Sequence, residues 1–120
     1  MLIGDLDSVS AADLARARAH GTVVEEHPND KDATDLELAL LHVVDALDDG
    51  APREVLVVGG HGGRSDHLVG NLLLLAAARF ATLRLRAWWG DDTIDVVHDT
   101  LTLHAAAAST VSIVAMHGPA

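Results

Sequence analysis

The middle of the chain carries an apolar, mostly β-branched run that leads directly into a glycine-rich stretch. Residues 54–58 (Glu-Val-Leu-Val-Val) precede the glycines of residues 59–63, and an apolar helix-like segment at 66–79 follows them. A near-continuous β-branched run is typical of a parallel strand covered on both faces, and parallel strands need long crossover connections. We therefore expect a strand, a glycine-containing turn and a helix, which together form the unit of an open α/β sheet.

The same alternation of strand and helix extends over the chain up to Gly90. Strands are expected at residues 1–3, 22–25 and 82–89, and helices at residues 11–19 and 34–47. Ser10 can cap the first of these helices and Gly21 stands just past its end. The predicted fold class is α/β: a mostly parallel sheet with flanking helices, in a Rossmann-like three-layer arrangement, over residues 1–92.

The pattern changes after Gly90. Short apolar runs at 94–97, 101–104 and 110–115 follow one another with no helix-like segment between them, and the alanines at 105–108 favour a loop. Closely spaced short strands are typical of antiparallel β structure. Residues 93–120 are therefore expected to begin a second, β-sandwich domain.

Composition narrows the classes of function. Apolar residues make up 49% of the chain, enough for a packed core, and the net charge of −10 leaves little basic surface for nucleic acid. There is no cysteine for thiolate chemistry, and the longest apolar run, 72–78, is far shorter than the roughly 20 residues that a membrane span needs. With no signal-peptide pattern, we expect a cytoplasmic protein that binds neither nucleic acid nor membrane.

Three polar motifs stand where an expected strand gives way to a helix. They are Gly4-Asp5-Leu6-Asp7-Ser8, Asp32-Ala33-Thr34-Asp35 and Gly62-Gly63-Arg64-Ser65-Asp66-His67. Open α/β sheets bind their ligands at the carboxyl ends of the strands. Together the motifs predict one site that holds Mg²⁺ and a polyphosphate.

The first motif supplies two carboxylates. Residues i and i+2 of an extended strand share a face, so Asp5 and Asp7 can both reach one ion. Mg²⁺ takes oxygen ligands, commonly one or two carboxylates with water and substrate phosphate. An aspartate-rich turn that only starts a helix explains the motif equally well, and Ser8 is available as its cap.

The second motif stands at a helix N-terminus. Asp32, Thr34 and Asp35 are residue types favoured as caps and in first turns, but one such residue is enough to cap a helix. Close carboxylate pairs repel by about 4 kcal/mol at an effective dielectric constant near 20. If Asp5, Asp7, Asp32 and Asp35 meet, a divalent cation is therefore the expected counter-charge.

The third motif combines backbone donors with a cation. Gly62 and Gly63 allow backbone N–H groups to line an anion site in front of a helix N-terminus. Arg64 can bind phosphate oxygens in a bidentate manner. The motif is not a Walker A sequence, because no Gly-Lys-Ser/Thr follows.

Polar residues continue from this motif into the helix. Asp66 is either the helix cap or a group that points into the site. His67 is either a structural hydrogen-bonding residue or a substrate contact. Asn71 lies four residues beyond His67, so both can face one cleft, although a solvated asparagine is about as well supported.

The three motifs, in this order, together with the Thr-Val-Ser-Ile-Val run at 110–114, resemble the thiamine pyrophosphokinase family. The resemblance implies transfer of diphosphate from ATP to thiamine, giving thiamine diphosphate and AMP, with Mg²⁺ as cofactor. It also implies a homodimer whose substrate sites use both subunits. Because the family has further segments before the first motif and after the Val-Ser strand, we expect the chain to be truncated at both ends.

The resemblance also implies roles for individual residues. Asp5, Asp7 and Asp35 would bind the metal and would act in catalysis together with Asp66. Contacts to ATP and its phosphates would come from Asp32, Thr34, Gly62, Gly63, Arg64, His67 and Asn71. Thiamine would lie against Asp66, as base or orienting group, and Ser112.

Two other functions are weighed against this one. A non-catalytic dimerisation module, or a nucleotide- or thiamine-binding remnant of the same fold, would bind ATP–Mg²⁺ or thiamine without turnover. A phosphatase with Asp5 as nucleophile would need a full apolar strand before the loop and a later lysine. Lys31 is the one lysine in the sequence and lies in the second motif's loop, so the phosphatase ranks low.

Overall fold

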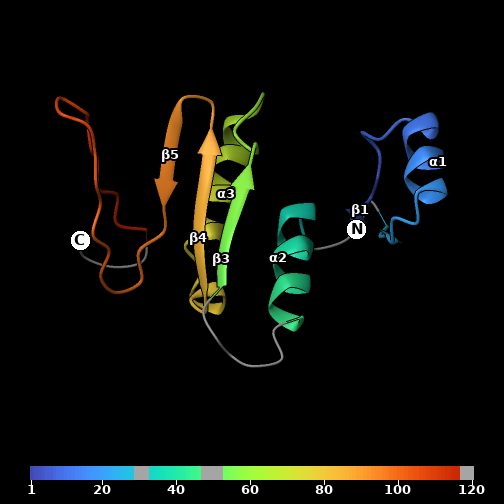
Figure 1. Ribbon diagram of the computed structural model, residues 1–120, viewed down its shortest axis with the longest axis horizontal. Helices are drawn as coiled ribbons and strands as arrows, with labels where there is room; N and C mark the ends of the chain where they lie inside the picture. The colour runs from blue at the N-terminus through green and yellow to red at the C-terminus, as the bar shows by residue number, and fades with distance from the viewer. Residues whose placement is uncertain (29–32, 47–52, 117–120) are drawn as a thin grey trace. The chain divides into compact units, whose positions relative to one another are not determined.

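The computed structural model describes residues 1–28, 33–46 and 53–116 (Figure 1). Over these residues the chain is mixed α/β, with three α-helices, one short 3-10 helix and two sheets. It divides into two compact units, Met1–Asp48 and Asp49–Ala120. Each unit is described by itself.

The first unit is built on a parallel pair of short strands. Strand β1 (Leu2–Gly4) pairs with β2 (Val24–Glu26), with Ile3 opposite Glu25. Helix α1 (Ala11–Ala19) connects them, and helix α2 (Asp35–Asp45) packs against β1. The expected alternation of strand and helix is therefore confirmed here, with strand bounds shifted by one or two residues.

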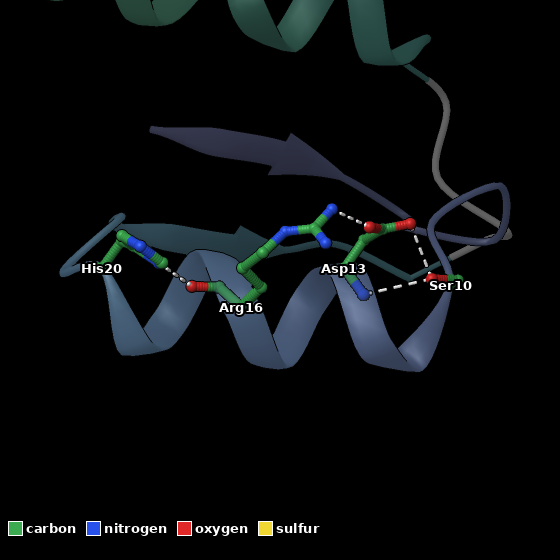
Figure 2. Close-up of polar contacts among 4 residues, drawn as sticks. All are labelled: Ser10, Asp13, Arg16 and His20. Atoms are coloured by element: carbon green, nitrogen blue, oxygen red, sulfur yellow. Dashed lines mark hydrogen bonds and ion pairs between the residues drawn. The ribbon is translucent and has the colours of Figure 1, made fainter.

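Local hydrogen bonds define α1, which has no buried residue of its own. At its start the Ser10 hydroxyl accepts from Asp13 N at 3.1 Å and donates to Asp13 Oδ2 at 2.6 Å, while Arg16 pairs with the same carboxylate (Figure 2). At its end His20 Nδ1 lies 2.8 Å from the carbonyl oxygen of Arg16, and Gly21 takes a φ of +74°. The predicted cap and stop of this helix are confirmed.

The second unit is a three-stranded sheet with a helical crossover. Strand β3 (Arg53–Val58) pairs in parallel with β4 (Leu83–Trp89), and β4 pairs antiparallel with β5 (Asp92–Asp95). Helix α3 (Ser65–Leu75) and a 3-10 turn (Ala78–Phe80) link the parallel strands. The helix expected to reach residue 79 thus ends earlier, because Ala77 is extended, with ψ of 134°.

The core of the second unit lies on one face of its sheet. Alternate residues of β4 are buried, and α3 and the 3-10 turn contribute buried side chains to the unit. The buried set is Leu74, Leu75, Phe80, Leu83, Leu85, Ala87 and Trp89. Side chains on the other face are exposed, including Leu56 at 45%, Val58 at 72% and Trp88 at 51%.

The expected three-layer sheet is therefore confirmed only as mixed α/β structure. The described strands form two separate sheets, each with one parallel pair, and β5 adds an antiparallel edge. A doubly wound parallel sheet has both faces covered, whereas the exposed face through Leu56 and Val58 is not. The arrangement is not clearly Rossmann-like.

Two of the strands predicted after Gly90 do not form. The first is found as β5, shifted to Asp92–Asp95, but residues 101–104 and 110–115 contain no strand. An alternating apolar pattern forms a strand only when a neighbouring strand supplies hydrogen bonds, and here side chains such as Ile113, 85% exposed, have no such cover. The alanines at 105–108 lie in a loop, as expected. The domain division at residues 92 and 93 stays a prediction.

Candidate functional site

Gly4 and Asp35 meet in the first unit and join two of the acidic motifs. A Cβ atom placed on Gly4 would lie 2.6 Å from Asp35 Cγ and within 2.9 Å of both carboxylate oxygens. The φ of Gly4 is +139°, a conformation that side chains on L-residues rarely adopt. The backbone N–H of Asp5 donates to Asp35 Oδ1 at 3.2 Å. Glycine is therefore required here on two grounds, and it places the Asp35 carboxylate against the start of the first motif.

Asp5 and Asp7 are also brought together, but not by strand geometry. Strand β1 ends at Gly4, and Leu6 has a φ of +60°, so the chain turns between the two aspartates. The backbone N–H of Asp7 donates to Asp5 Oδ1 at 3.2 Å in this turn. The expectation that both carboxylates share one face of an extended strand is therefore wrong, because the strand is too short to contain them.

Thr34 is the N-cap of α2, and its hydroxyl accepts from Glu37 N at 3.2 Å. Its structural role is thus shown, while its expected contact with ATP stays a prediction. Asp32 lies outside the described residues. Among the residues that are described, no group of three or more histidine, aspartate or glutamate side chains is gathered closely enough to hold a metal ion.

The glycine-rich loop of the second unit folds back onto α3. Asn71 Nδ2 donates to the carbonyl oxygen of Gly60 at 2.8 Å, so this amide makes a defined contact. Gly60 itself has a φ of +99°, and a Cβ on it would lie 3.4 Å from Asn71 Nδ2 and 3.6 Å from Trp89 Nε1. Gly62 and Gly63 lie further along the loop and are exposed.

Arg64 and Asp66 form a bidentate ion pair at the start of α3. Arg64 Nε lies 3.1 Å from Asp66 Oδ1, and Nη2 lies 2.5 Å from Oδ2. The hydrogen bond from Arg64 lowers the pKa of Asp66 to about 2. The N-cap position is Arg64, without a side-chain cap bond, so the alternative in which Asp66 caps the helix is wrong. Asp66 is instead held by the arginine.

The remaining predicted residues lie at the surface. His67 is exposed in the first turn of α3, and Ser112 is exposed in the extended segment after β5. A shallow hollow on α1, lined by Asp13, Arg16, Ala17 and His20, contains none of the predicted site residues. None of the helices within the described ranges is long and apolar enough to cross a membrane.

Comparison with known proteins agrees with the motifs. Residues 1–87 match the family model described as thiamin pyrophosphokinase, catalytic domain. The thiamine pyrophosphokinase of Bacillus subtilis (strain 168) is 31% identical over 83 residues, which are 69% of this chain and 37% of that protein. A thiamin pyrophosphokinase family protein from Enterococcus faecalis, solved by crystallography, is 29% identical with a TM-score of 0.52, over 73% of this chain and 42% of its own.

The chain belongs to the thiamin pyrophosphokinase family, matching the model of its catalytic domain over most of its length. The resemblance drawn from the motifs is thereby confirmed. The chain spans about two fifths of the length of the relatives that it matches. The activity, substrates and assembly of those longer proteins are therefore carried over only as proposals.

Sequence reasoning missed Gly60 and Trp89 as members of the loop cluster. The signal for Gly60 was its place directly after the strand, where a positive φ is often needed. The alternation along β4 was enough to place Trp89 on the buried face and Trp88 on the exposed one. Nothing in the sequence showed that the Trp89 indole would face Gly60.

Proposed function

We propose that the chain is the α/β part of an ATP-dependent diphosphotransferase that converts thiamine to thiamine diphosphate. In this reaction the hydroxyethyl oxygen of thiamine attacks the β-phosphorus of ATP, the bond from that phosphorus to the α,β-bridging oxygen breaks, and AMP leaves. The hydroxyl proton passes to solvent. The observation that carries the proposal is the junction of Gly4, Asp5 and Asp35, which joins the first two motifs of a chain in this family.

The donor set at this junction fits Mg²⁺. Asp5 and Asp35 offer carboxylate oxygens, and Mg²⁺ in phosphate-transfer sites commonly takes one or two carboxylates, with water and substrate phosphates as its other ligands. We assign Asp5 and Asp35 as the residues that hold the ion, with Asp7 and Asp32 as further ligands. When bound, Mg²⁺ neutralises charge on the phosphates and so favours attack.

The ion pair in the second unit suggests how Arg64 and Asp66 divide the work. A carboxylate with a pKa of about 2 stays ionised at neutral pH and is a weak proton acceptor, so Asp66 orients the thiamine hydroxyl instead of acting as a strong base. Exposed ion pairs contribute little net stability. Arg64, with its side chain 66% exposed, can therefore exchange the Asp66 carboxylate for phosphate oxygens at small cost.

The segment after β5 supports the expected homodimer. Val111, Ile113 and Val114 are 59%, 85% and 72% exposed, and Ser112 lies among them. Apolar side chains grouped in this way favour burial against a partner. A second copy of the chain is the proposed partner, and this contact would bring Ser112 into a thiamine site. Light scattering that gives a monomer mass over the working concentration range would contradict this assembly.

The test of the function is a product assay with the chain, ATP, Mg²⁺ and thiamine. We expect AMP and thiamine diphosphate in equal amounts, resolved by chromatography. Asp35→Asn should lower the rate by at least about a hundredfold, since loss of a metal ligand removes several kcal/mol of transition-state stabilisation. Asp45→Asn, on the same helix and exposed, is the matched control and should leave the rate unchanged.

The same assay distinguishes the non-catalytic alternative. ATP–Mg²⁺ binding in a calorimeter without any product would identify a nucleotide-binding module of this fold. Product from a longer version of the protein, but not from this chain, would show that the chain lacks part of the machinery. Neither binding nor product from either version would contradict both assignments. The cytoplasmic location stays a prediction.

A further inference from the structure

Trp89 carries a buried polar atom that the described structure leaves without a hydrogen-bond partner. The residue is 5% exposed at the end of β4, and its indole Nε1 is buried with no acceptor. Buried N–H groups are nearly always paired in folded proteins, because burying one unpaired is costly. An unpaired indole N–H beside the glycine-rich loop therefore points to a ligand atom that it binds.

The indole N–H faces the empty side-chain position of Gly60. A Cβ atom there would lie 3.6 Å from Trp89 Nε1 and 3.4 Å from Asn71 Nδ2. Asn71 Nδ2 carries two hydrogens, and its bond to the Gly60 carbonyl oxygen uses one of them. Two N–H donors, one from β4 and one from α3, thus border a space that any other residue at position 60 would fill.

We propose that Trp89 and Asn71 bind a phosphoryl oxygen of the substrate in the space beside Gly60. Both side-chain groups nearest that space are donors, which suits an oxygen carrying negative charge. This inference rests on the proposed function and adds Trp89 to it as a phosphate-binding residue. It also gives Asn71 a double role, since one hydrogen holds the loop and the other binds the ligand.

Nuclear magnetic resonance of the indole N–H tests the proposal directly. The chain has two tryptophans, so the Trp88→Phe variant leaves one indole signal, that of Trp89. Titration with inorganic diphosphate and with ATP–Mg²⁺ should move this signal downfield in a saturable manner, and adenosine should not move it. A signal that moves with adenosine but not with diphosphate, or that moves with none of the three, overturns the proposal.

Variants that remove one feature at a time give an independent readout. Trp89→Phe keeps an aromatic ring in the core but removes the N–H, and should weaken ATP–Mg²⁺ binding about tenfold. Trp88→Phe, at a side chain 51% exposed, should leave it unchanged. Gly60→Ala fills the space, whereas Gly59→Ala meets no atom within 4 Å at a similar positive φ, so Gly60→Ala should weaken binding more.

The failures of the two proposals are distinguishable. If the wild-type chain binds ATP–Mg²⁺ while Trp89→Phe binds it equally well and the indole signal stays fixed, the role of Trp89 is wrong and the diphosphotransferase proposal stands. If the wild-type chain binds neither diphosphate nor ATP–Mg²⁺, both fail. Far-ultraviolet circular dichroism of each variant checks that the fold is retained.

Discussion

Replacing Gly4 with alanine tests the junction on which the proposed metal site depends. The new Cβ would lie 2.6 Å from Asp35 Cγ and 2.7 Å from Asp35 Oδ2, at a backbone φ of +139°. Side chains do not approach this closely, so the Asp35 carboxylate must move away. Its hydrogen bond from Asp5 N would then be lost.

The expected cost has two parts. A residue other than glycine at such a φ costs about 1–3 kcal/mol in backbone strain. Loss of the hydrogen bond to Asp35 adds about 0.5–1.5 kcal/mol. We therefore expect Gly4→Ala to lower the free energy of unfolding by about 2–4 kcal/mol. Gly21→Ala is the matched control: its φ is +74° with nothing within 4 Å, so only strain of about 1–2 kcal/mol applies.

Urea unfolding followed by far-ultraviolet circular dichroism measures these values. The double variant Gly4→Ala/Asp35→Ala separates the two parts, because removing the carboxylate relieves the contact but not the strain. Its cost should fall below the sum of the single variants by about 1 kcal/mol. Strict additivity, or equal losses for Gly4→Ala and Gly21→Ala, would show that the contact between Gly4 and Asp35 does not constrain the site.

Three further changes probe other parts of the account. Arg64→Gln should raise the pKa of Asp66 from about 2 toward 3.8, measured by carboxyl carbon resonances; an unchanged value would mean that Arg64 is not the cause. Because that pKa is depressed in the folded state, the ion pair stabilises the fold above about pH 3.8 and loses this effect as the pH falls toward 2. Thr34→Ala should cost about 1 kcal/mol in urea unfolding through loss of the α2 cap, with serine restoring it; a loss that serine does not restore would exclude capping as the cause. Phe80→Ala, at 0% exposure, should cost about 3–5 kcal/mol, against less than about 0.5 kcal/mol for Ile113→Ala at 85% exposure; similar losses at both would contradict the assigned core.

Elements with local signals were predictable from the sequence. Both bounds of α1 follow from a capping serine and a terminal glycine, which act within a few residues. The strands at 101–104 and 110–115 failed because an alternating pattern does not itself provide a neighbouring strand. Helix α3 ends before residue 79 although alanine and leucine favour helix, since propensity is a weak constraint beside tertiary packing.

The candidate site was predictable in its residue types but not in its contacts. The need for glycine at position 4 was expected, and the structure shows that the atoms it admits belong to Asp35. The pairing of Arg64 with Asp66 and the approach of Trp89 to Gly60 depend on side-chain directions that spacing alone does not fix. Asp5 and Asp7 come together through a positive φ at Leu6, which is uncommon for leucine and has no sequence signal.

The central claim is diphosphate transfer from ATP at a magnesium-dependent site. Phosphorus-31 resonance of the chain with ATP and thiamine, recorded before and after addition of Mg²⁺, tests it in one measurement. The account predicts that the lines of AMP and thiamine diphosphate grow in equal amounts only after Mg²⁺ is added, and that Asp35→Asn abolishes their growth. Formation of ADP and inorganic phosphate, or a spectrum that Mg²⁺ and the chain leave unchanged, would contradict it.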